Sequence, residues 1–343
     1  MALRGEGRQH RIGLIGCGWF SHFHLDALLR LGDRVRVVWV ADPDETKARS
    51  LASEAGARPL ADYREGLGEV DAAFVLVPHH LHHPVTVACL DAGLHVLLEK
   101  PMALTTAEAD GMIAAADRAG RALMVAYPHR YRPGMQVFRE AVTGGRYGRL
   151  IMLDALMDET VKGYVTGWIA RRETLGGGVF FSASPHMLDV MLWVAGEVRS
   201  LSLVGTRGGS GIEGEDTACA VIKFESGAIG VTRHTWASPR PQVWYTMRAL
   251  CERAYVTLTT TPVGNFIAEG PRCRWQTRVT ALGAEEEVLL ESDEGLEVLP
   301  EIRHFLDCVE TGRTPQTDGR AGRRMIALVR EAYRDAEARG ALD

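Results

Sequence analysis

The chain has 343 residues, of which 46% are hydrophobic and 24% are charged, a composition typical of globular proteins rather than disordered or fibrous ones. At ~150 residues per domain, this length predicts about two domains. The 39 Lys and Arg residues against 44 Asp and Glu residues give a net charge of −5, which argues against nucleic acid and anionic membranes as partners.

The termini and the cysteines favour a cytoplasmic protein. The basic N-terminal segment MALRGEGRQHR is not followed by the apolar stretch of a secretory signal, and no uncharged apolar run approaches the ~18 residues that span a bilayer. The six cysteines lack CxxC or zinc-type spacing, as expected for free thiols in a reducing compartment.

The first third of the chain alternates strand-like and helix-like segments. Predicted strands are Arg11–Ile15, Val35–Ala41, Ala72–Val77, His95–Leu98 and Ala122–Ala126. Predicted helices are Phe20–Leu31, a helix capped by Asp44 that ends before Gly56, Val85–Ala92, and a helix from Thr105 to Gly120. This alternation predicts βαβ units around a parallel sheet. We therefore expect an α/β fold with a Rossmann dinucleotide-binding domain over residues 1–127.

The pattern changes after Tyr127. Pro128, Pro133 and Gly134 mark a boundary, and a linking helix is predicted at Met135–Val142. Successive strands with short connections follow between about Ser200 and Leu290, which favours antiparallel neighbours. These strands are Asp216–Phe224, Ala228–Trp236, Val243–Leu250 and Ala254–Thr259, and two helices follow at Glu301–Glu310 and Arg320–Ala338. We expect residues 128–343 to form an α+β domain with a large, mostly antiparallel open sheet.

Both faces of the predicted strand Val243–Leu250 are partly apolar, since Trp244 and Leu250 share one face and Tyr245 and Met247 the other. One face can pack on helices, and the other is available to a second subunit. The sheet of this domain is therefore expected to mediate self-association.

A glycine-rich turn follows the first strand. Gly16-Cys17-Gly18-Trp19-Phe20-Ser21 opens the first helix, where glycines let the backbone approach a pyrophosphate and the helix N-terminus supplies N–H groups. Asp42 ends the second strand 24 residues beyond Gly18, where a carboxylate can bind a ribose 2′-OH and repel a 2′-phosphate. These features predict a dinucleotide, with NAD(H) favoured over NADP(H).

Glu99-Lys100-Pro101 follows the strand His95–Leu98, at the carboxyl edge where ligands bind in such sheets. A lysine there can orient a substrate and stabilise a developing alkoxide. The histidine-rich stretch between Pro78 and Pro84 also follows a strand. No cysteine or carboxylate stands at ligand spacing, so we expect a loop under the nicotinamide rather than a metal site.

Several motifs in order support a family resemblance. They are Gly16-Cys17-Gly18 with His24, Asp42, Val77-Pro78 with His80 and His82, Glu99-Lys100-Pro101, Tyr131 with Pro133, Gly176-Gly177-Gly178, and His186 and Asp189 in Ser-Pro-His-Met-Leu-Asp. By these residues the chain resembles the glucose–fructose oxidoreductase/inositol dehydrogenase/MocA (Gfo/Idh/MocA) family over nearly its whole length.

The resemblance implies a nicotinamide-dependent oxidoreductase of a sugar, cyclitol or related polyol, assembled as a homodimer or homotetramer. It implies that Lys100 contacts the substrate hydroxyl and the nicotinamide ribose, and that His186 exchanges the hydroxyl proton while hydride moves. An imidazole titrates near neutrality and can serve as base or acid. The expected cofactor-binding residues are Gly16, Gly18, Trp19, Phe20, Asp42, Val77, Pro78, His82, Glu99 and Lys100.

Three departures from the family pattern concern the site. Ser182 stands where many members carry an Asp that assists proton transfer, and a hydroxyl cannot hold that proton near pH 7. Asp189 can orient His186, and a capping or salt-bridge role is an equal alternative. The Trp-Arg pair that often approaches the cofactor reads Trp168-Ile169, with Arg171 and Arg172 nearby. Pro185 is expected to bias Ser184 away from helical geometry.

No sequence motif identifies the residues that line the substrate pocket. By approximate placement alone, the candidates are Arg130, Asp158, Tyr164 and Trp236. Asp154, Asp158 and Glu159 either bind sugar hydroxyls or form a solvated edge. Two other functions stay open: redox-assisted epimerisation, elimination or glycoside cleavage with recycled NAD, and a non-catalytic NAD-binding sensor.

Overall fold

A computed structural model describes residues 9–342 except 162–164, 166, 240–244, 265–268 and 296–297. The chain forms two compact units. Unit 1 comprises Met1–Ala126 and Glu297–Arg324, and unit 2 comprises Tyr127–Leu296 and Met325–Asp343. A late segment of the chain therefore belongs with the N-terminal unit, and the division into domains at residue 127 stays a prediction.

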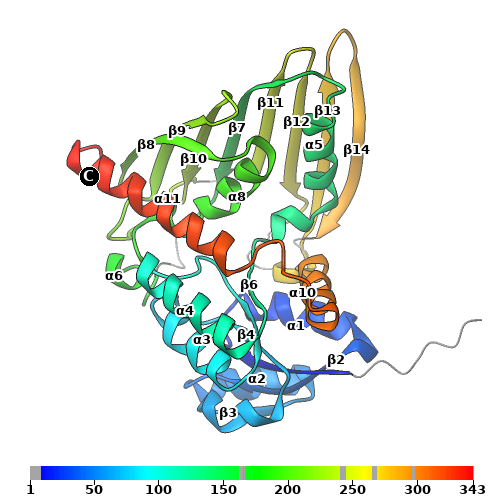
Figure 1. Cartoon of the computed structure of the whole chain (residues 1–343), viewed down its shortest axis with the longest axis vertical. Coiled ribbons are helices and arrows are strands. Elements are labelled where there is room, and N and C mark those ends of the chain that lie inside the picture. Colours follow the sequence, from blue (N-terminus) through cyan, green and yellow to red (C-terminus); the bar gives the residue numbers. More distant parts are fainter. Residues whose placement is uncertain are drawn as a thin grey trace, which may run out of the picture. The chain divides into compact units, whose positions relative to one another are not determined.

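Unit 1 contains a parallel sheet of six strands in the order β3-β2-β1-β4-β5-β6 (Figure 1). The strands are β1 His10–Ile15, β2 Val35–Ala41, β3 Arg58–Leu60, β4 Ala72–Val75, β5 His95–Leu98 and β6 Leu123–Val125. The predicted parallel sheet is confirmed, and β3, which has three residues, is the strand that sequence patterns missed. The chain builds outward from β1 to β3 and then crosses to β4, so the strand order reverses between β1 and β4.

Local signals explain where the helices of unit 1 begin and end. The Asp44 side chain caps α2 by accepting the N–H groups of Thr46 and Lys47. Thr105 and Glu108 form a reciprocal capping box at α4. The helices are α1 Ser21–Arg30, α2 Glu45–Ala55, α3 His82–Asp91 and α4 Thr106–Ala119, with the short 3-10 helices η1 Gly32–Arg34, η2 Tyr63–Glu69 and η3 His79–Leu81.

The segment from late in the chain completes the β6 edge of unit 1. It contains α10 Leu299–Thr311 and the start of α11 Gly319–Ala338. Val125 donates its N–H to the Thr317 carbonyl at 2.8 Å, and the Thr317 hydroxyl donates to the Val125 carbonyl at 2.7 Å. Thr317 is fully buried, so this edge strand is covered by the rest of its own unit.

Unit 2 is built on an eight-stranded sheet in the order β14-β13-β12-β11-β7-β10-β9-β8. The strands are β7 Leu150–Asp158, β8 Val198–Thr206, β9 Thr217–Phe224, β10 Ile229–Thr235, β11 Tyr245–Cys251, β12 Tyr255–Pro262, β13 Arg274–Leu282 and β14 Glu286–Gly295. Strand β7 lies between β11 and β10. It pairs in parallel with β10, and all other neighbours in the sheet are antiparallel. The mostly antiparallel sheet was predicted correctly. Val243 and Trp244 lie outside the described residues.

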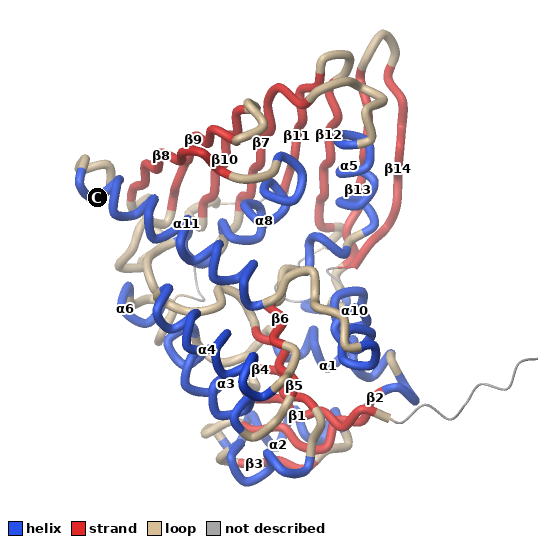
Figure 2. Tube along the Cα trace, viewed as in Figure 1, coloured by secondary structure: helices blue, strands red, loops and turns tan. Residues whose placement is uncertain are grey.

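Helices cover one face of this sheet, as the blue and red elements of Figure 2 show for α5 and α8. In β7, Leu153, Ala155 and Met157 are buried on that face, while the alternate residues Asp154 and Asp158 lie on the other face. The helices are α5 Pro133–Thr143, α6 Arg172–Leu175, α7 Val179–Ser182, α8 Ser184–Ala195 and the rest of α11, with the short 3-10 helices η4 Pro128–Tyr131 and η5 Gly270–Arg272.

Helix α8 corrects one expectation. Ser184 is its first residue rather than an extended one, because proline is tolerated in the first turn of a helix, where its missing N–H would have no partner. None of the described helices has both the length and the apolar composition of a membrane span. The segments Arg172–Ser182 and Ser184–Ala195 reach that length only together, and they are bent by 42° relative to each other. All six cysteines are free thiols.

Candidate functional site

The glycine turn of unit 1 lies between β1 and α1, at the carboxyl edge of the sheet. Gly16 has φ +98°, and a Cβ there would lie 2.5 Å from the Leu76 carbonyl oxygen, so only glycine fits. A Cβ on Gly18 would instead meet nothing within 4 Å, so the loop leaves open space at this position. Ser21 is buried and its hydroxyl bonds the Gly18 carbonyl, which closes the turn.

The Asp42 carboxylate ties the turn to the end of β2. Its Oδ2 accepts the Cys17 N–H at 2.8 Å, and its Oδ1 accepts the Asp44 N–H at 2.9 Å. The side chain is half-buried, and each oxygen has a further lone pair for a hydroxyl. Burial raises the pKa of Cys17 to about 12, so the thiol in this turn stays protonated and is no nucleophile near neutral pH.

Trp19 and Phe20 stand at the start of α1. Trp19 is 48% exposed, although its ring meets Phe23 edge-on at 4.9 Å. Phe20 stacks on Phe23 at 5.0 Å. The exposed indole beside an open glycine turn is a surface that an aromatic or apolar ligand group can cover.

The segment after β5 carries a buried acid and the predicted catalytic lysine. Glu99 Oε1 lies 2.9 Å from His24 Nε2, inside the unit, and Glu99 Oε2 accepts the Lys100 N–H at 3.2 Å. Lys100 is half-buried, and its peptide bond to Pro101 is cis. Glu99 therefore orders the main chain that presents Lys100.

His82 is the first residue of α3, after the loop that follows β4. Its ring is fully buried, with Nδ1 2.7 Å from the Pro101 carbonyl oxygen and Nε2 2.9 Å from the Val77 carbonyl oxygen. Burial lowers the pKa of His82, although both carbonyls oppose that shift. Both ring nitrogens thus face main-chain oxygens, so His82 joins the Val77-Pro78 loop to the Lys100-Pro101 turn, and its role in cofactor binding stays a prediction.

The residues at this edge fit a dinucleotide. The open position at Gly18, the acceptor Asp42 and the two loops joined by His82 lie at the carboxyl ends of β1, β2, β4 and β5. Ligands bind outside these ends where the strand order reverses. No group of three His, Cys, Asp or Glu side chains in the described part of the chain is placed to hold a metal ion.

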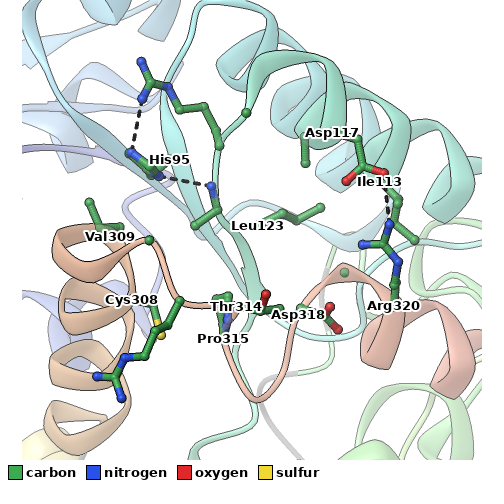
Figure 3. Close-up of a pocket in the computed structure, with 17 residues that line it drawn as sticks. His95, Ile113, Asp117, Leu123, Cys308, Val309, Thr314, Pro315, Asp318 and Arg320 are labelled. Carbon is green, nitrogen blue, oxygen red and sulfur yellow. Dashed lines mark hydrogen bonds and ion pairs between the residues drawn. The ribbon is translucent and has the colours of Figure 1, made fainter.

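A separate cavity of about 240 Å³ in unit 1 lies away from this edge (Figure 3). It is lined by His95 and Leu123, which begin β5 and β6, and by the loop around Thr314. It is therefore at the amino ends of the strands. Its walls include the ion pair between Asp117 and Arg320 at 3.1 Å, and we assign no part of the nucleotide site to it.

In unit 2, the triple glycine is explained by close packing. A Cβ on Gly177 would lie 2.6 Å from the Tyr333 hydroxyl, and one on Gly178 would lie 2.0 Å from the Glu215 carbonyl oxygen. Tyr333 donates to Glu215 Oε1 at 2.5 Å and accepts the Gly178 N–H at 3.0 Å. Burial raises the pKa of Glu215. This network anchors the turn that leads into α7 and α8.

His186 is half-buried on α8, whereas its neighbours along that helix are buried. Its ring meets the His129 ring at 5.0 Å with an interplanar angle of 84°. Ser182 ends α7 and is 5% exposed. His129 was not among the predicted site residues. Its position between Pro128 and Pro133 at the domain boundary was the available signal, but nothing in the sequence connects it to His186.

Asp189 forms the salt bridge that was one of its predicted alternatives. Its carboxylate accepts from Arg130 Nε and Nη2, and Arg130 also lies over the Trp193 ring at 5.7 Å. Arg130, a substrate candidate, is thus 7% exposed and bound to Asp189. Arg172 is paired with Glu337, which engages one of the two arginines near Trp168.

Two of the remaining substrate candidates, Asp158 and Trp236, have partners within unit 2. Asp158 lies on the sheet face opposite α8 and pairs with Arg233 at 2.8 Å. Trp236 is buried and donates its Nε1–H to Glu159 at 2.6 Å. Tyr164 lies outside the described residues. Lys100 belongs to unit 1 and His186 to unit 2.

Comparisons with known proteins agree with this architecture. A model described as an oxidoreductase family with an NAD-binding Rossmann fold matches residues 10–127, and a GFO/IDH/MocA C-terminal domain matches residues 135–257. The chain is 28% identical to D-apiose dehydrogenase of Paraburkholderia graminis, over 94% of this chain and 86% of that protein. It is 32% identical to inositol 2-dehydrogenase 2 of Saccharopolyspora erythraea, over 64% of each.

Among solved structures, the chain is similar to the WlbA dehydrogenase from Bordetella pertussis in complex with NADH and UDP-GlcNAcA. The two align with a TM-score of 0.79 and 27% identity, over 96% of this chain and 97% of that chain.

Proposed function

Because the chain belongs to the Gfo/Idh/MocA family of oxidoreductases, we propose that it is an NAD(H)-dependent dehydrogenase or reductase. Its substrate would be a carbinol or carbonyl of a sugar, a cyclitol or a related polyol. The observation that carries the proposal is the open glycine turn at Gly18 beside the Asp42 carboxylate, at the edge of the sheet where Lys100 is also presented. The relatives named as apiose and inositol dehydrogenases support this substrate class.

Each residue of the proposed site would have a distinct role. Gly16 and Gly18 would let the backbone approach the pyrophosphate, and Asp42 would accept a hydrogen bond from the adenosine ribose. Lys100 would hold the substrate hydroxyl and stabilise negative charge on its oxygen. His186 would take the hydroxyl proton in oxidation and return it in reduction. The bound nicotinamide would supply the hydride acceptor or donor.

Asp42 supports NAD over NADP, because its carboxylate would repel a 2′-phosphate. Replacing Asp42 with Ala should weaken NAD binding and reduce the discrimination against NADP. Titration of both cofactors by fluorescence measures this directly. Unchanged affinities for both would show that Asp42 does not bind the ribose.

The activity test uses the full chain with NAD or NADH and a panel of sugars, cyclitols and their keto forms. Net oxidoreductase activity should appear as a change in absorbance at 340 nm, a property of the reduced nicotinamide. Tightly co-purifying cofactor with product formation but no net NADH would favour the redox-neutral alternative. No turnover of any panel member in either direction would contradict the proposal.

The role of His186 is tested in the same assay. His186→Ala should lower the oxidation rate by ~10²–10⁴-fold, the usual contribution of general base catalysis, and leave NAD affinity unchanged. The wild-type rate should rise with pH through one ionisation near neutrality, and the variant should lose this limb. If the variant keeps both rate and limb, Lys100 becomes the candidate base.

A further inference from the structure

We propose that His129 is a positioning residue that fixes the orientation of the His186 imidazole. The inference rests on the proposed function of His186 as the group that exchanges the substrate proton. It adds a second histidine to the site, one that acts through His186 rather than on the substrate.

The geometry places His129 against two rings at once. Its ring is nearly perpendicular to His186, at 84° and 5.0 Å between centroids, and to Tyr245, at 80° and 4.9 Å. Edge-to-face contacts at these separations are the preferred arrangement of aromatic pairs. His129 is 3% exposed and Tyr245 is 1% exposed, so the His129 ring is enclosed between β11 and α8.

The two segments that carry these histidines, η4 and α8, are also joined by hydrogen bonds of neighbouring residues. Arg130, the next residue, binds Asp189 through Nε and Nη2 at 2.5 and 2.7 Å, and Asp189 lies one helical turn after His186. Gln136 donates its amide to the Arg130 carbonyl at 2.5 Å. Adjacent residues of η4 therefore contact two residues on one side of α8, which fixes both backbones at the point where the histidine rings meet.

A positioned neighbour matters because the helix alone leaves the ring direction open. The outer torsion of a histidine side chain, χ2, is broad and roughly two-fold, so α8 fixes the Cβ of His186 more firmly than its ring nitrogens. Proton exchange requires a nitrogen within hydrogen-bond reach of the hydroxyl, and small misplacements of a catalytic group cost large factors in rate. A perpendicular ring packed against His186 restricts χ2 and would hold the reacting nitrogen in one direction.

The test is a double-mutant cycle on the full-length holoenzyme, in the 340 nm assay. His129→Leu should lower kcat by about 10- to 100-fold and leave the KM for NAD unchanged. In a His186→Ala background, the same substitution should cause no further loss, because residues that act as one unit are not additive. His129→Phe keeps an aromatic ring at this place and should recover most of kcat.

The control is His22→Leu, a histidine on the exposed side of α1 with 41% of its side chain accessible, which should leave kcat unchanged. Thermal unfolding confirms that each variant is folded, and His129→Gln replaces His129→Leu if the latter does not fold. Losses that multiply in the double variant, or a full rate in the single variant, would overturn the inference. If kcat falls in His186→Ala but not in His129→Leu, only the positioning role of His129 is rejected. If His186→Ala keeps its full rate, both the proposed base and this inference are rejected.

Discussion

Asp189 binds Arg130 in the interior of unit 2 through two hydrogen bonds, to Nε at 2.5 Å and to Nη2 at 2.7 Å. The two side chains are 4% and 8% exposed, and they are 59 residues apart in the chain. A paired fork of this kind sets both the distance and the angle between the segments that carry it. It joins η4 to α8, the helix of the proposed base.

Removing one partner of this pair should strongly destabilise unit 2. Asp189→Ala leaves a buried guanidinium without its counter-charge, and we expect a loss of about 3–5 kcal/mol in the free energy of unfolding, measured by urea denaturation. The matched control is Glu225→Ala, which breaks the exposed pair with Arg199 and should cost at most about 1 kcal/mol. Equal losses in the two variants would show that the buried pair contributes no more than a surface pair.

The two glycines of the turn should respond differently to alanine. Gly18→Ala adds a methyl group to open space, so the melting temperature should stay unchanged while NAD affinity falls at least ~10-fold, because the methyl group occupies the approach of the pyrophosphate. Gly16→Ala forces a side chain into positive φ against the Leu76 carbonyl and should lower stability by more than about 1 kcal/mol. Calorimetry with and without NAD separates the two effects. Wild-type NAD affinity in folded Gly18→Ala would place the pyrophosphate elsewhere.

His234 should make unit 2 sensitive to acid. It is fully buried, and burial lowers its pKa to about 3, with a smaller contribution from Arg233. An unfolded histidine titrates near 6.5, so between about pH 3 and 6.5 the unfolded chain binds the extra proton. Stability therefore falls as the pH decreases through this window and returns as it rises.

At about pH 4.5 this one group should cost about 2–3 kcal/mol relative to neutral pH. Urea denaturation at both pH values measures the loss, and His234→Leu should reduce it by that amount, even though the variant leaves the Thr232 hydroxyl without its 2.5 Å partner at either pH. An undiminished acid sensitivity in His234→Leu would assign it to other groups.

The face of the unit 2 sheet opposite α5 and α8 should mediate self-association. Six apolar side chains on this face are between 37% and 53% exposed: Val204, Val221, Ile229, Tyr255, Leu282 and Val288. Exposed apolar side chains spread over one face of a sheet, among charged ones, are typical of a subunit interface. We expect a dimer or tetramer by sedimentation, and the double variant Val221→Lys/Ile229→Lys should dissociate it. Leu29→Lys, at an equally exposed position on α1, should not, and a monomeric wild-type chain would contradict the prediction.

The sequence predicted those elements whose signals are local. The strand Val35–Ala41 and the helix between Asp44 and Gly56 have the expected bounds, because a buried apolar run and helix caps are read from neighbouring residues. β3 was missed because three residues, two of them exposed, show no period. The parallel pairing of β7 with β10 was not predicted either. Short connections predict the pairing of consecutive strands, and these two strands are not consecutive.

In the candidate site, too, the features with local signals were predicted and those that depend on tertiary packing were not. The glycine turn and Asp42 follow a spacing rule, so the sequence brought them together correctly. The contact between His129 and His186, and the choice of Arg130 as the partner of Asp189, depend on tertiary packing between η4 and α8. Asp158 lies on the sheet face opposite the buried residues of β7. The sequence did not predict this, because which residues of a strand face the core depends on its neighbours; its contact with a substrate stays a prediction.

The pairing of Val125 with Thr317 also bears on how the protein is made. The ribosome releases the strands of unit 1 first, and Thr317, which pairs with β6, follows Val125 by 192 residues. At 5–20 residues per second, those residues take roughly 10–40 s to synthesise, and during that time the nascent parallel sheet has an exposed edge. Unit 1 is therefore completed only when residues 297–324 have been made, and a fragment that stops at residue 126 would lack part of its own fold.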